Sequence, residues 1–361
     1  MSKLKVDVCV VGAGPGGTLL AYLLAKKDLS VLLIERSEKI GKFFRGEHIN
    51  EDGEAILKKH HLFDGVEELG LLRMEHIEYW HNGELFKAID PDPAIGHLSI
   101  HVPQANLLTA ILNEAQKLPN FHLWLNTTVS DLVQDESSRY VAVKTKHGQE
   151  VQVVEADLII GTDGRYSTVR KKAGLNLATS KHGFDLLWAR IPAPANWSSS
   201  IKNASIEDLQ LAVYSQANGF IQIGWNIKEG SFPTLHKQPI SPFIDKLIEA
   251  FPELEKTVRN NIQSWHDFVL LDVFSSFSEE WGKEGLLCIG DAVHTMTPTG
   301  GYGLNCALKD ADLLADILHK ENIAHVDFTE YISERKKEAK KLLAFQIEME
   351  QTFIENFAVL S

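Results

Sequence analysis

Residues 12–17 read Gly-Ala-Gly-Pro-Gly-Gly, a spacing of glycines that can hold the pyrophosphate of a dinucleotide. The first glycine permits a tight turn, the second lets the backbone approach the phosphates, and the last lets a helix pack against a strand. The N-terminus of that helix would offer amide donors and a partial positive charge to the phosphates. The residues expected to bind a cofactor here are Gly12, Gly14, Pro15, Gly16 and Gly17.

A carboxylate follows this turn at the end of the next strand. Val6–Val11 is typical of a buried parallel strand, Thr18–Lys27 of a helix, and Ser30–Ile34 of a second strand that ends at Glu35. The Glu35 carboxylate can accept hydrogen bonds from the two hydroxyls of a ribose and disfavours a 2′-phosphate, and the adjacent Arg36 is included in the expected site. This βαβ unit alone does not separate NAD from FAD.

Two further strands end in acidic residues beside glycine. The apolar run from Leu158 ends at Asp163-Gly164, and the run from Leu287 ends at Gly290-Asp291. The second continues through a glycine-rich stretch, Pro298 to Asn305, into an expected helix.

These three motifs, in this order and at these separations, resemble the flavin-dependent aromatic hydroxylases typified by p-hydroxybenzoate hydroxylase, over roughly residues 5–345. The resemblance implies a single-component monooxygenase that holds FAD without a covalent bond. NADH or NADPH would serve as transient reductant. An oxygen atom from O₂ would pass through a flavin C4a-hydroperoxide to an aromatic or similar electron-rich small molecule.

The resemblance also assigns roles to individual residues. It implies that Asp291 bonds a ribitol hydroxyl, that Asp163 and Gly164 serve FAD and the pyridine nucleotide, and that Pro298 lies at the reactive face of the flavin. The turn before the last helix would bring a positive dipole end to the pyrimidine ring, where reduced flavin carries negative charge. The residues of that turn are Gly301, Gly303, Leu304 and Asn305.

Three polar residues in the first third of the chain complete the expected cofactor region. Arg45 matches a family arginine near the pyrophosphate or a mobile flavin, and Gln104 stands where it would hydrogen-bond ribitol or phosphate without charge. His48 follows the Arg45 segment and is a candidate base for a phenolic proton, because an imidazole titrates near neutrality. An ordinary polar contact is the alternative for His48.

The strands in the middle of the chain suggest a substrate pocket. Tyr214-Ser215-Gln216 and the run from Phe220 resemble the pocket-forming hairpin of p-hydroxybenzoate hydroxylase, but the loop between them is shorter and lacks the arginines that bind a benzoate carboxylate. A neutral, larger or heteroaromatic ring is therefore expected. The expected pocket residues are Trp188, Tyr214, Ser215, Phe220 and Trp225, and packing within the sheet is the alternative for each.

Nucleotide-binding elements occur at both ends and in the middle of the chain, with strand-rich stretches between them. We therefore expect an α/β fold: an FAD-binding, Rossmann-like parallel-sheet domain interleaved with a mostly antiparallel β-sheet substrate domain, and C-terminal helices. The FAD-binding domain would comprise residues 1–73, 98–180 and 266–361, and the substrate domain residues 74–97 and 181–265. Residues 74–89 predict a hairpin around Asn82-Gly83, residues 243–260 a helix, and residues 328–357 a long helix or helix pair.

Composition limits the partners. The formal net charge of -13 and the absence of basic stripes argue against nucleic acid. Cys9, Cys288 and Cys306 are scattered thiols without a CxxC pair, which fits a reducing cytosol and offers neither a disulfide framework nor a zinc site. No apolar run approaches the length of a membrane span. We expect a cytoplasmic monomer or homodimer without a metal.

Several alternatives remain open at this stage. A flavin-dependent halogenase would share the FAD domain, and Ile191-Pro192 matches part of its Trp-x-Trp-x-Ile-Pro strand, but Trp188 is one place out of register. A flavin-dependent reductase of prenyl double bonds and a catalytically idle FAD-binding scaffold are further alternatives. An NAD-dependent dehydrogenase would not need the motif at Gly290-Asp291.

Overall fold

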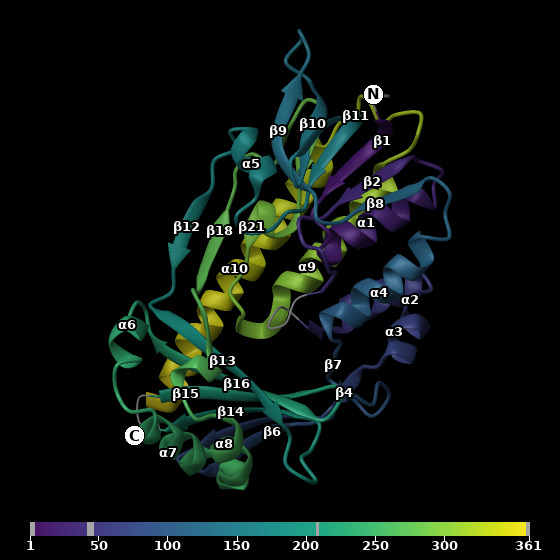
Figure 1. Cartoon of the computed structure of the whole chain (residues 1–361). Helices are drawn as coiled ribbons and strands as arrows, with labels where there is room; N and C mark the ends of the chain where they lie inside the picture. The colour runs from purple at the N-terminus through teal and green to yellow at the C-terminus, as the bar shows by residue number, and fades with distance from the viewer. Residues whose placement is uncertain (1–3, 42–46, 207–208, 359–361) are drawn as a thin grey trace.

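The computed structural model describes residues 4–41, 47–206 and 209–358. In Figure 1 one large sheet lies in the upper part of the molecule and a second lies across the lower part, and the long helix α10 (Thr329–Ala358) runs beside both. Among the described residues, no helix combines the length and apolar character needed to cross a membrane.

The first sheet carries the nucleotide-binding motifs. The Val-, Ile- and Leu-rich runs of its central parallel strands, at residues 8–11, 31–34, 158–161 and 286–288, are buried on both faces, as a parallel sheet requires. β1 (Leu4–Val11) is central, and α1 (Pro15–Ala25) packs against α9 (Tyr302–Ile317). The parallel strands lie in the order β20 (Leu286–Cys288), β11 (Glu150–Gly161), β1, β2 (Val31–Ile34) and β8 (Phe121–Trp124). The antiparallel additions are β19 (Gly282–Lys283), which pairs with β20, and β10 (Tyr140–His147) and β9 (Thr128–Gln134), which extend from β11.

The second sheet is antiparallel except where β14 meets β5. Its order is β17 (Val269–Leu271), β13 (Phe184–Pro192), β16 (Phe220–Lys228), β15 (Leu209–Gln216), β14 (Ser200–Ile206), β5 (His76–His81) and β6 (Glu84–Ile89). The β5–β6 hairpin turns at Asn82 and Gly83, both with positive φ, as predicted. One face of this sheet packs on α7 (Ser241–Ala250) and α8 (Glu255–Asn261), and the other faces the first sheet.

Shorter elements connect these layers. One three-stranded sheet contains β3 (His48–Ile49), β7 (Ser99–His101) and β4 (Leu72–Met74), and another contains β12 (Ala178–Lys181), β18 (Phe274–Phe277) and β21 (His294–Thr295). The remaining α-helices are α2 (Glu51–Lys59), α3 (Phe63–Leu69), α4 (Gln104–Ala115), α5 (Thr168–Lys172) and α6 (Phe232–Leu235).

The expected fold class is confirmed, with one difference in its helices. Residues 243–260 do not form one helix: α7 ends at Ala250 and α8 begins at Glu255, because Pro252 lacks the amide that a continuous helix needs. The C-terminal segment forms one long helix, α10, which is the first of the two arrangements expected.

Candidate active site

A cavity of about 1200 Å³ lies between the two sheets and joins the three motifs. Glu35, Arg36, Gln104 and Pro298 line it. Arg45 lies outside the described residues. The motif residues that line the cavity are Gly12, Gly14, Pro15, Gly16, Gly17, Asp163, Gly164, Asp291, Gly301, Gly303 and Leu304.

The first turn fits tightly between β1 and the end of β11. Gly12 has a φ of 107° and donates its amide to the carbonyl oxygen of Ile34 at 2.7 Å. A Cβ on Gly17 would lie 2.1 Å from the Gly12 carbonyl oxygen and 2.3 Å from Oγ1 of Thr162, so only glycine fits there. Thr162 Oγ1 donates to the carbonyl oxygens of Val11 (2.9 Å) and Gly12 (2.7 Å). Our sequence analysis did not identify Thr162 as a support of this turn.

Glu35 lies across from this turn. Its Oε2 accepts the amide of Ala13 at 3.0 Å and its Oε1 accepts the amide of Ser37 at 2.9 Å. Gly14 is the N-cap of α1, and as a glycine it has no side chain to bond the first-turn amides. These amides and the glycine cradle therefore suit a pyrophosphate, and the carboxylate suits a ribose. The adenosine diphosphate part of FAD fits these residues.

The Asp163 carboxylate is used within the protein. It accepts the amides of Thr168 (2.6 Å) and Val169 (3.2 Å) and a hydrogen bond from Ser167 Oγ, and so caps the start of α5. Burial raises its pKa in spite of these bonds. Asp163 thus shapes the end of β11 through bonds within the protein, while it also lines the cavity. The buried Arg170, which follows, donates to the carbonyl oxygen of Ala292 at 2.7 Å and ties this motif to the Gly290-Asp291 turn.

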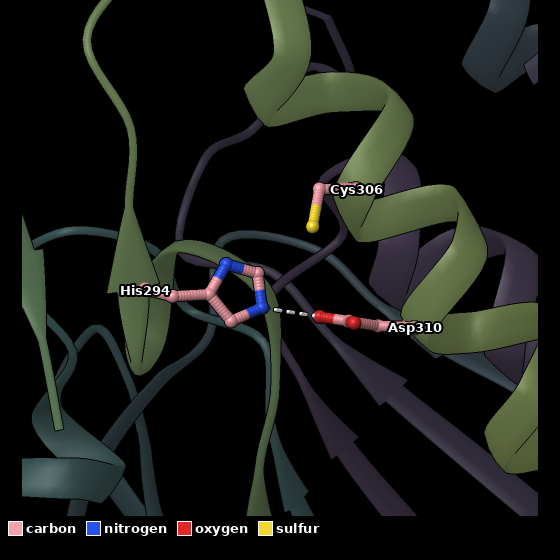
Figure 2. Close-up of side chains that lie close together, drawn as sticks. All are labelled: His294, Cys306 and Asp310. Carbon is pink, nitrogen blue, oxygen red and sulfur yellow. Dashed lines mark hydrogen bonds and ion pairs between the residues drawn. The ribbon is translucent and has the colours of Figure 1, made fainter. Parts of the chain in front are cut away.

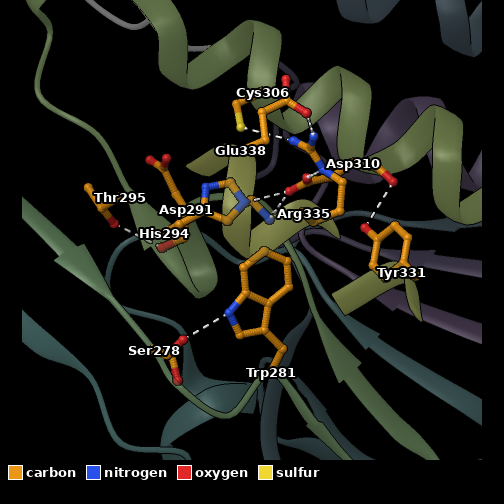
Figure 3. A network of polar contacts seen from close by, with 11 residues as sticks. Ser278, Trp281, Asp291, His294, Thr295, Cys306, Asp310, Tyr331, Arg335 and Glu338 are labelled. Carbon is orange, nitrogen blue, oxygen red and sulfur yellow. Dashed lines mark hydrogen bonds and ion pairs between the residues drawn. The ribbon is translucent and has the colours of Figure 1, made fainter. Parts of the chain in front are cut away.

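A buried network supports the Gly290-Asp291 turn from behind (Figure 3). Asp310 on α9 accepts the amide of Gly290 at 2.8 Å, His294 Nε2 at 2.7 Å and Arg335 Nε at 2.6 Å. The side chains of Asp310, His294 and Arg335 are at most 1% exposed. Burial opposes ionisation, but His294 and Arg335 lower the pKa of Asp310 below its usual value. The Asp291 carboxylate points toward the cavity side, 3.6 Å from Arg165 Nε.

Three of these buried groups, His294, Cys306 and Asp310, lie close enough together to resemble a metal site (Figure 2). Arg335 donates to Asp310 and also to Cys306 Sγ, at 3.1 Å, so a fixed positive charge already occupies the acceptors. Burial raises the pKa of the Cys306 thiol, which disfavours the thiolate that a metal prefers. The arrangement is that of an ion-pair network.

The glycine-rich turn before α9 has an unusual backbone. Gly300 and Gly301 have φ values of 71° and 67°, and Gly301, the N-cap of the helix that begins at Tyr302, has no side chain to cap it. Asn305, expected at the cofactor, bonds the protein instead. Its Nδ2 donates to the His48 carbonyl oxygen (3.1 Å) and its Oδ1 accepts the Asn50 amide (3.1 Å). Asn305 therefore positions the segment beside His48.

His48 lies against the turn but is a weak base. A Cβ on Gly301 would lie 3.3 Å from the Cβ of His48, and His48 Nε2 lies 2.8 Å from Ser99 Oγ. Burial, followed by the neighbouring His101, lowers the pKa of His48 to about 4. This lowering argues against the prediction that His48 removes a phenolic proton, because an acceptor of such low pKa competes poorly for it.

Two residues that sequence analysis did not assign to the site, Glu47 and His101, lie together on the cavity wall. Ala217 donates its amide to His101 Nδ1 at 3.2 Å, so the ring proton is on Nε2, 3.3 Å from Glu47 Oε2. The Gln104 amide donates to Glu47 Oε1 at 3.3 Å. Gln104 thus contacts this pair through its backbone.

The second sheet forms the other wall through alternate residues of each strand. On β16, Gln222, Gly224 and Asn226 line the cavity. Trp188 and Tyr214 also line it, with ring centroids 5.7 Å apart. A Cβ on Gly224 would lie 2.9 Å from the Trp188 ring, so this glycine makes room for the indole.

Three expected pocket residues lie elsewhere, and none is among the described residues that line the cavity. Trp225 is one residue out of phase with Gly224, so it points to the opposite face and stacks on Phe243. Ser215 is out of phase in the same way and accepts the amide of Ser200 at 2.9 Å. Phe220, at the start of β16, lies 4.2 Å from the guanidinium of Arg190.

The lowered pKa of His48 predicts a pH-dependent stability. The unfolded chain takes up a proton at this residue near pH 6.5, whereas the folded chain does so only near pH 4. The free energy of unfolding should therefore fall, as pH decreases from 6.5 to 4, by on the order of 2 kcal/mol from this residue. Urea unfolding of the wild type and of His48→Gln across this range should show a shallower decline for the variant. Equal declines would contradict the assignment, and the exposed His236→Gln serves as control.

Comparisons with known proteins identify the family of this chain. A model of the family described as "FAD binding domain" matches residues 5–346. The 6-methylpretetramide 4-monooxygenase of Streptomyces rimosus is 30% identical over 350 residues, which cover 94% of this chain and 82% of that protein. The para-nitrophenol 4-monooxygenase of Pseudomonas sp. strain WBC-3 is 24% identical, over 91% of this chain and 82% of that protein.

A solved structure shows the same fold. PqsL of Pseudomonas aeruginosa, in complex with 2-aminobenzoylacetate, superposes with a TM-score of 0.85 and covers 98% of both chains at 18% identity. Because the family model and the Streptomyces relative each span most of the chain, this protein belongs to the FAD binding domain family and is an FAD-dependent monooxygenase, or hydroxylase.

Proposed function

We propose that this protein hydroxylates a neutral aromatic molecule that carries several hydrogen-bonding groups, with NADH or NADPH as reductant and O₂ as oxidant. The observation that carries the proposal is the lining of the cavity. Among the described residues that the seven-stranded sheet contributes to it, none is charged, while aromatic and carboxamide side chains are frequent. A carboxylated phenol would need a positive partner on this wall.

The polar groups on this wall are arranged in pairs. Asn226 Nδ2 donates to Gln210 Oε1 at 3.1 Å, and Gln216 Nε2 donates to Gln222 Oε1 at 2.6 Å. Burial, helped by Tyr79, raises the pKa of Tyr214 to about 12, so its hydroxyl stays neutral. Neutral donors and acceptors recognise hydroxyl, carbonyl or amide groups on an otherwise apolar ring system.

Bound FAD would supply the reductive activation of O₂. The residues of this chain would do the rest: Asp291 would hold the ribitol, and the uncapped start of α9 would stabilise negative charge on the reduced ring. Trp188 and Tyr214 would orient the substrate ring and exclude water. The Glu47–His101 pair would hold a proton at His101 Nε2 on the cavity wall.

The names of the relatives support the reaction class. The Streptomyces relative is named as a monooxygenase acting at position 4 of 6-methylpretetramide, and the Pseudomonas relative as one acting on para-nitrophenol.

The decisive experiment combines reductant use with oxygen labelling. Purified protein should retain FAD and oxidise NADH or NADPH faster when neutral polyhydroxylated aromatics are supplied. Under ¹⁸O₂ the product mass should rise by one labelled oxygen atom. Substrate-stimulated turnover that gives a reduced or halogenated product, without label, would overturn the proposal.

The wall residues should control substrate affinity separately from cofactor affinity. Trp188→Leu removes the aromatic ring that packs on Gly224 and should raise KM about tenfold, because ring contacts and apolar burial contribute about 1–2 kcal/mol. FAD affinity should stay within twofold. Trp197→Leu, on the opposite face of the same sheet, should leave KM unchanged. A titration of FAD alongside steady-state kinetics separates the two effects.

A further inference from the structure

The backbone of the loop that contains Pro298 is weakly restrained by its own sequence. Gly300 and Gly301 both occupy the left-handed region and follow directly after it, and glycine restricts the backbone least. The loop nevertheless lies between the two halves of the cavity. The loop ends near Asp291, a residue expected to bind FAD, since a Cβ on Gly303 would lie 3.8 Å from Asp291 Oδ1. Its position must be fixed from outside.

Two side chains of α10 supply that restraint. Gln346 Nε2 donates to the carbonyl oxygens of Thr297 (2.9 Å) and Thr299 (2.5 Å). Glu350 Oε1 accepts the hydroxyls of the same two residues, at 2.8 Å and 2.7 Å. Gln346 and Glu350 are four residues apart and so lie on one face of the helix. Together they bind the carbonyl oxygens and the hydroxyls of Thr297 and Thr299, the two neighbours of Pro298.

The orientation of Gln346 supports a specific role. The side chain is fully buried, and its Oε1 finds no hydrogen-bond donor within the described part of the chain. Turning the amide over would place Oε1 against two carbonyl oxygens, so the loop dictates its orientation. An unpaired buried acceptor is costly, and it is tolerated here in exchange for two bonds to the loop.

Glu350 also reaches the substrate side. Its Oε2 lies 2.7 Å from His182 Nδ1, and His182 Nε2 lies 2.9 Å from Ser275 Oγ. Burial opposes ionisation of Glu350, but its bonds to His182, Thr299 and Thr297 lower its pKa below the usual value. An ionised carboxylate only accepts, so the proton lies on Nδ1. His182 directly precedes Gly183 and β13, which begins at Phe184.

We propose that Glu350 and Gln346 are positioning residues that clamp the Thr297–Thr299 loop to α10 and so set the wall of the flavin-binding cavity at the junction with the substrate sheet. The clamp rests on FAD binding, which the family establishes, and not on the identity of the substrate. In Figure 1, α10 runs beside β21 and β18 down to the second sheet, the course that this role requires.

The test compares FAD affinity in the full chain. Glu350→Ala and Gln346→Ala should each weaken FAD binding about tenfold, the equivalent of about 1.4 kcal/mol. Glu350→Gln keeps an oxygen that can accept both threonine hydroxyls and should stay within about twofold of wild type. Glu348→Ala, an exposed neighbour on the same helix, is the matched control. Fluorescence titration with FAD gives the dissociation constants without any turnover.

A variant on the loop side tests the same contact in case the α10 variants fold poorly. Thr299→Val removes one clamped hydroxyl from the loop side with little change in shape and should weaken FAD binding several-fold. It should also lower the fraction of NAD(P)H converted to product rather than to hydrogen peroxide. The proposal is overturned if Glu350→Ala and Thr299→Val match Glu348→Ala in FAD affinity. It is also overturned if Glu350→Gln loses as much affinity as Glu350→Ala while remaining folded. Because FAD affinity is measured directly, failure of the clamp is distinguishable from a wrong substrate class.

Discussion

Replacing Asp291 with alanine is expected to weaken FAD binding by about 10- to 100-fold, because a hydrogen bond to a charged group contributes about 1.5–3 kcal/mol. The carboxylate lines the cavity beside Gly303, and Arg165 Nε lies 3.6 Å from its Oδ2. Dialysis followed by an absorbance scan would measure the bound flavin.

The matched control for this change is Asp316→Ala, an exposed carboxylate on α9. It should retain FAD as the wild type does. Asp291→Asn keeps an acceptor oxygen and should lose less affinity than Asp291→Ala. An Asp291→Ala protein that stays fully yellow after dialysis would contradict the role given to this residue.

Replacing Asp310 with alanine should cost about 3–5 kcal/mol of folding free energy, since the buried Arg335 loses one of its two carboxylate partners and keeps only Glu338. Arg335 would keep its guanidinium at 1% exposure, and Gly290 and His294 would lose their shared acceptor. Chemical unfolding monitored by tryptophan fluorescence would measure the loss.

A compensating variant makes this prediction specific. The double variant Asp310→Leu with Arg335→Met removes both charges and should recover part of the lost stability, because an apolar pair of similar volume does not bury an unpaired charge. If the double variant is less stable than Asp310→Ala, the ion pair is not the source of the effect.

The strands and turns of the cofactor region could be predicted because each has a local signature. Gly17 follows a β-branched run at the spacing that a tight crossover needs, and Asn82-Gly83 specifies its turn directly. The hydrogen-bond partners of Asp163 and Asn305 could not be predicted from a local signature of this kind. Whether a carboxylate or amide faces a ligand or bonds nearby main chain depends on a few degrees of backbone rotation that sequence does not display.

The residues of the substrate pocket were harder to predict, because the central strands of the second sheet are buried on both faces and hydrophobicity does not show which face lines the cavity. On β16 the run from Phe220 to Ile227 contains Trp225 and Ile223 on one face and Gln222 and Asn226 on the other. The aromatic Trp225 suggested a pocket, but it lies on the opposite face. The carboxamides of Gln222 and Asn226 mark the face that lines the cavity, and their alternation along the strand was visible in the sequence. Glu350 gave no such signal, since its partners lie 51 to 168 residues away along the chain.

The order of strands in the first sheet has a consequence for biosynthesis. β1 leaves the ribosome first, yet its neighbour β11 must wait for β20, which begins only at Leu286, before the sheet has its full parallel core. The wall that holds the flavin ring comes later still, with residues 297–304 and the helix α10 behind them. The complete FAD site therefore needs almost the whole chain, and we expect full FAD affinity only after α10 has been synthesised.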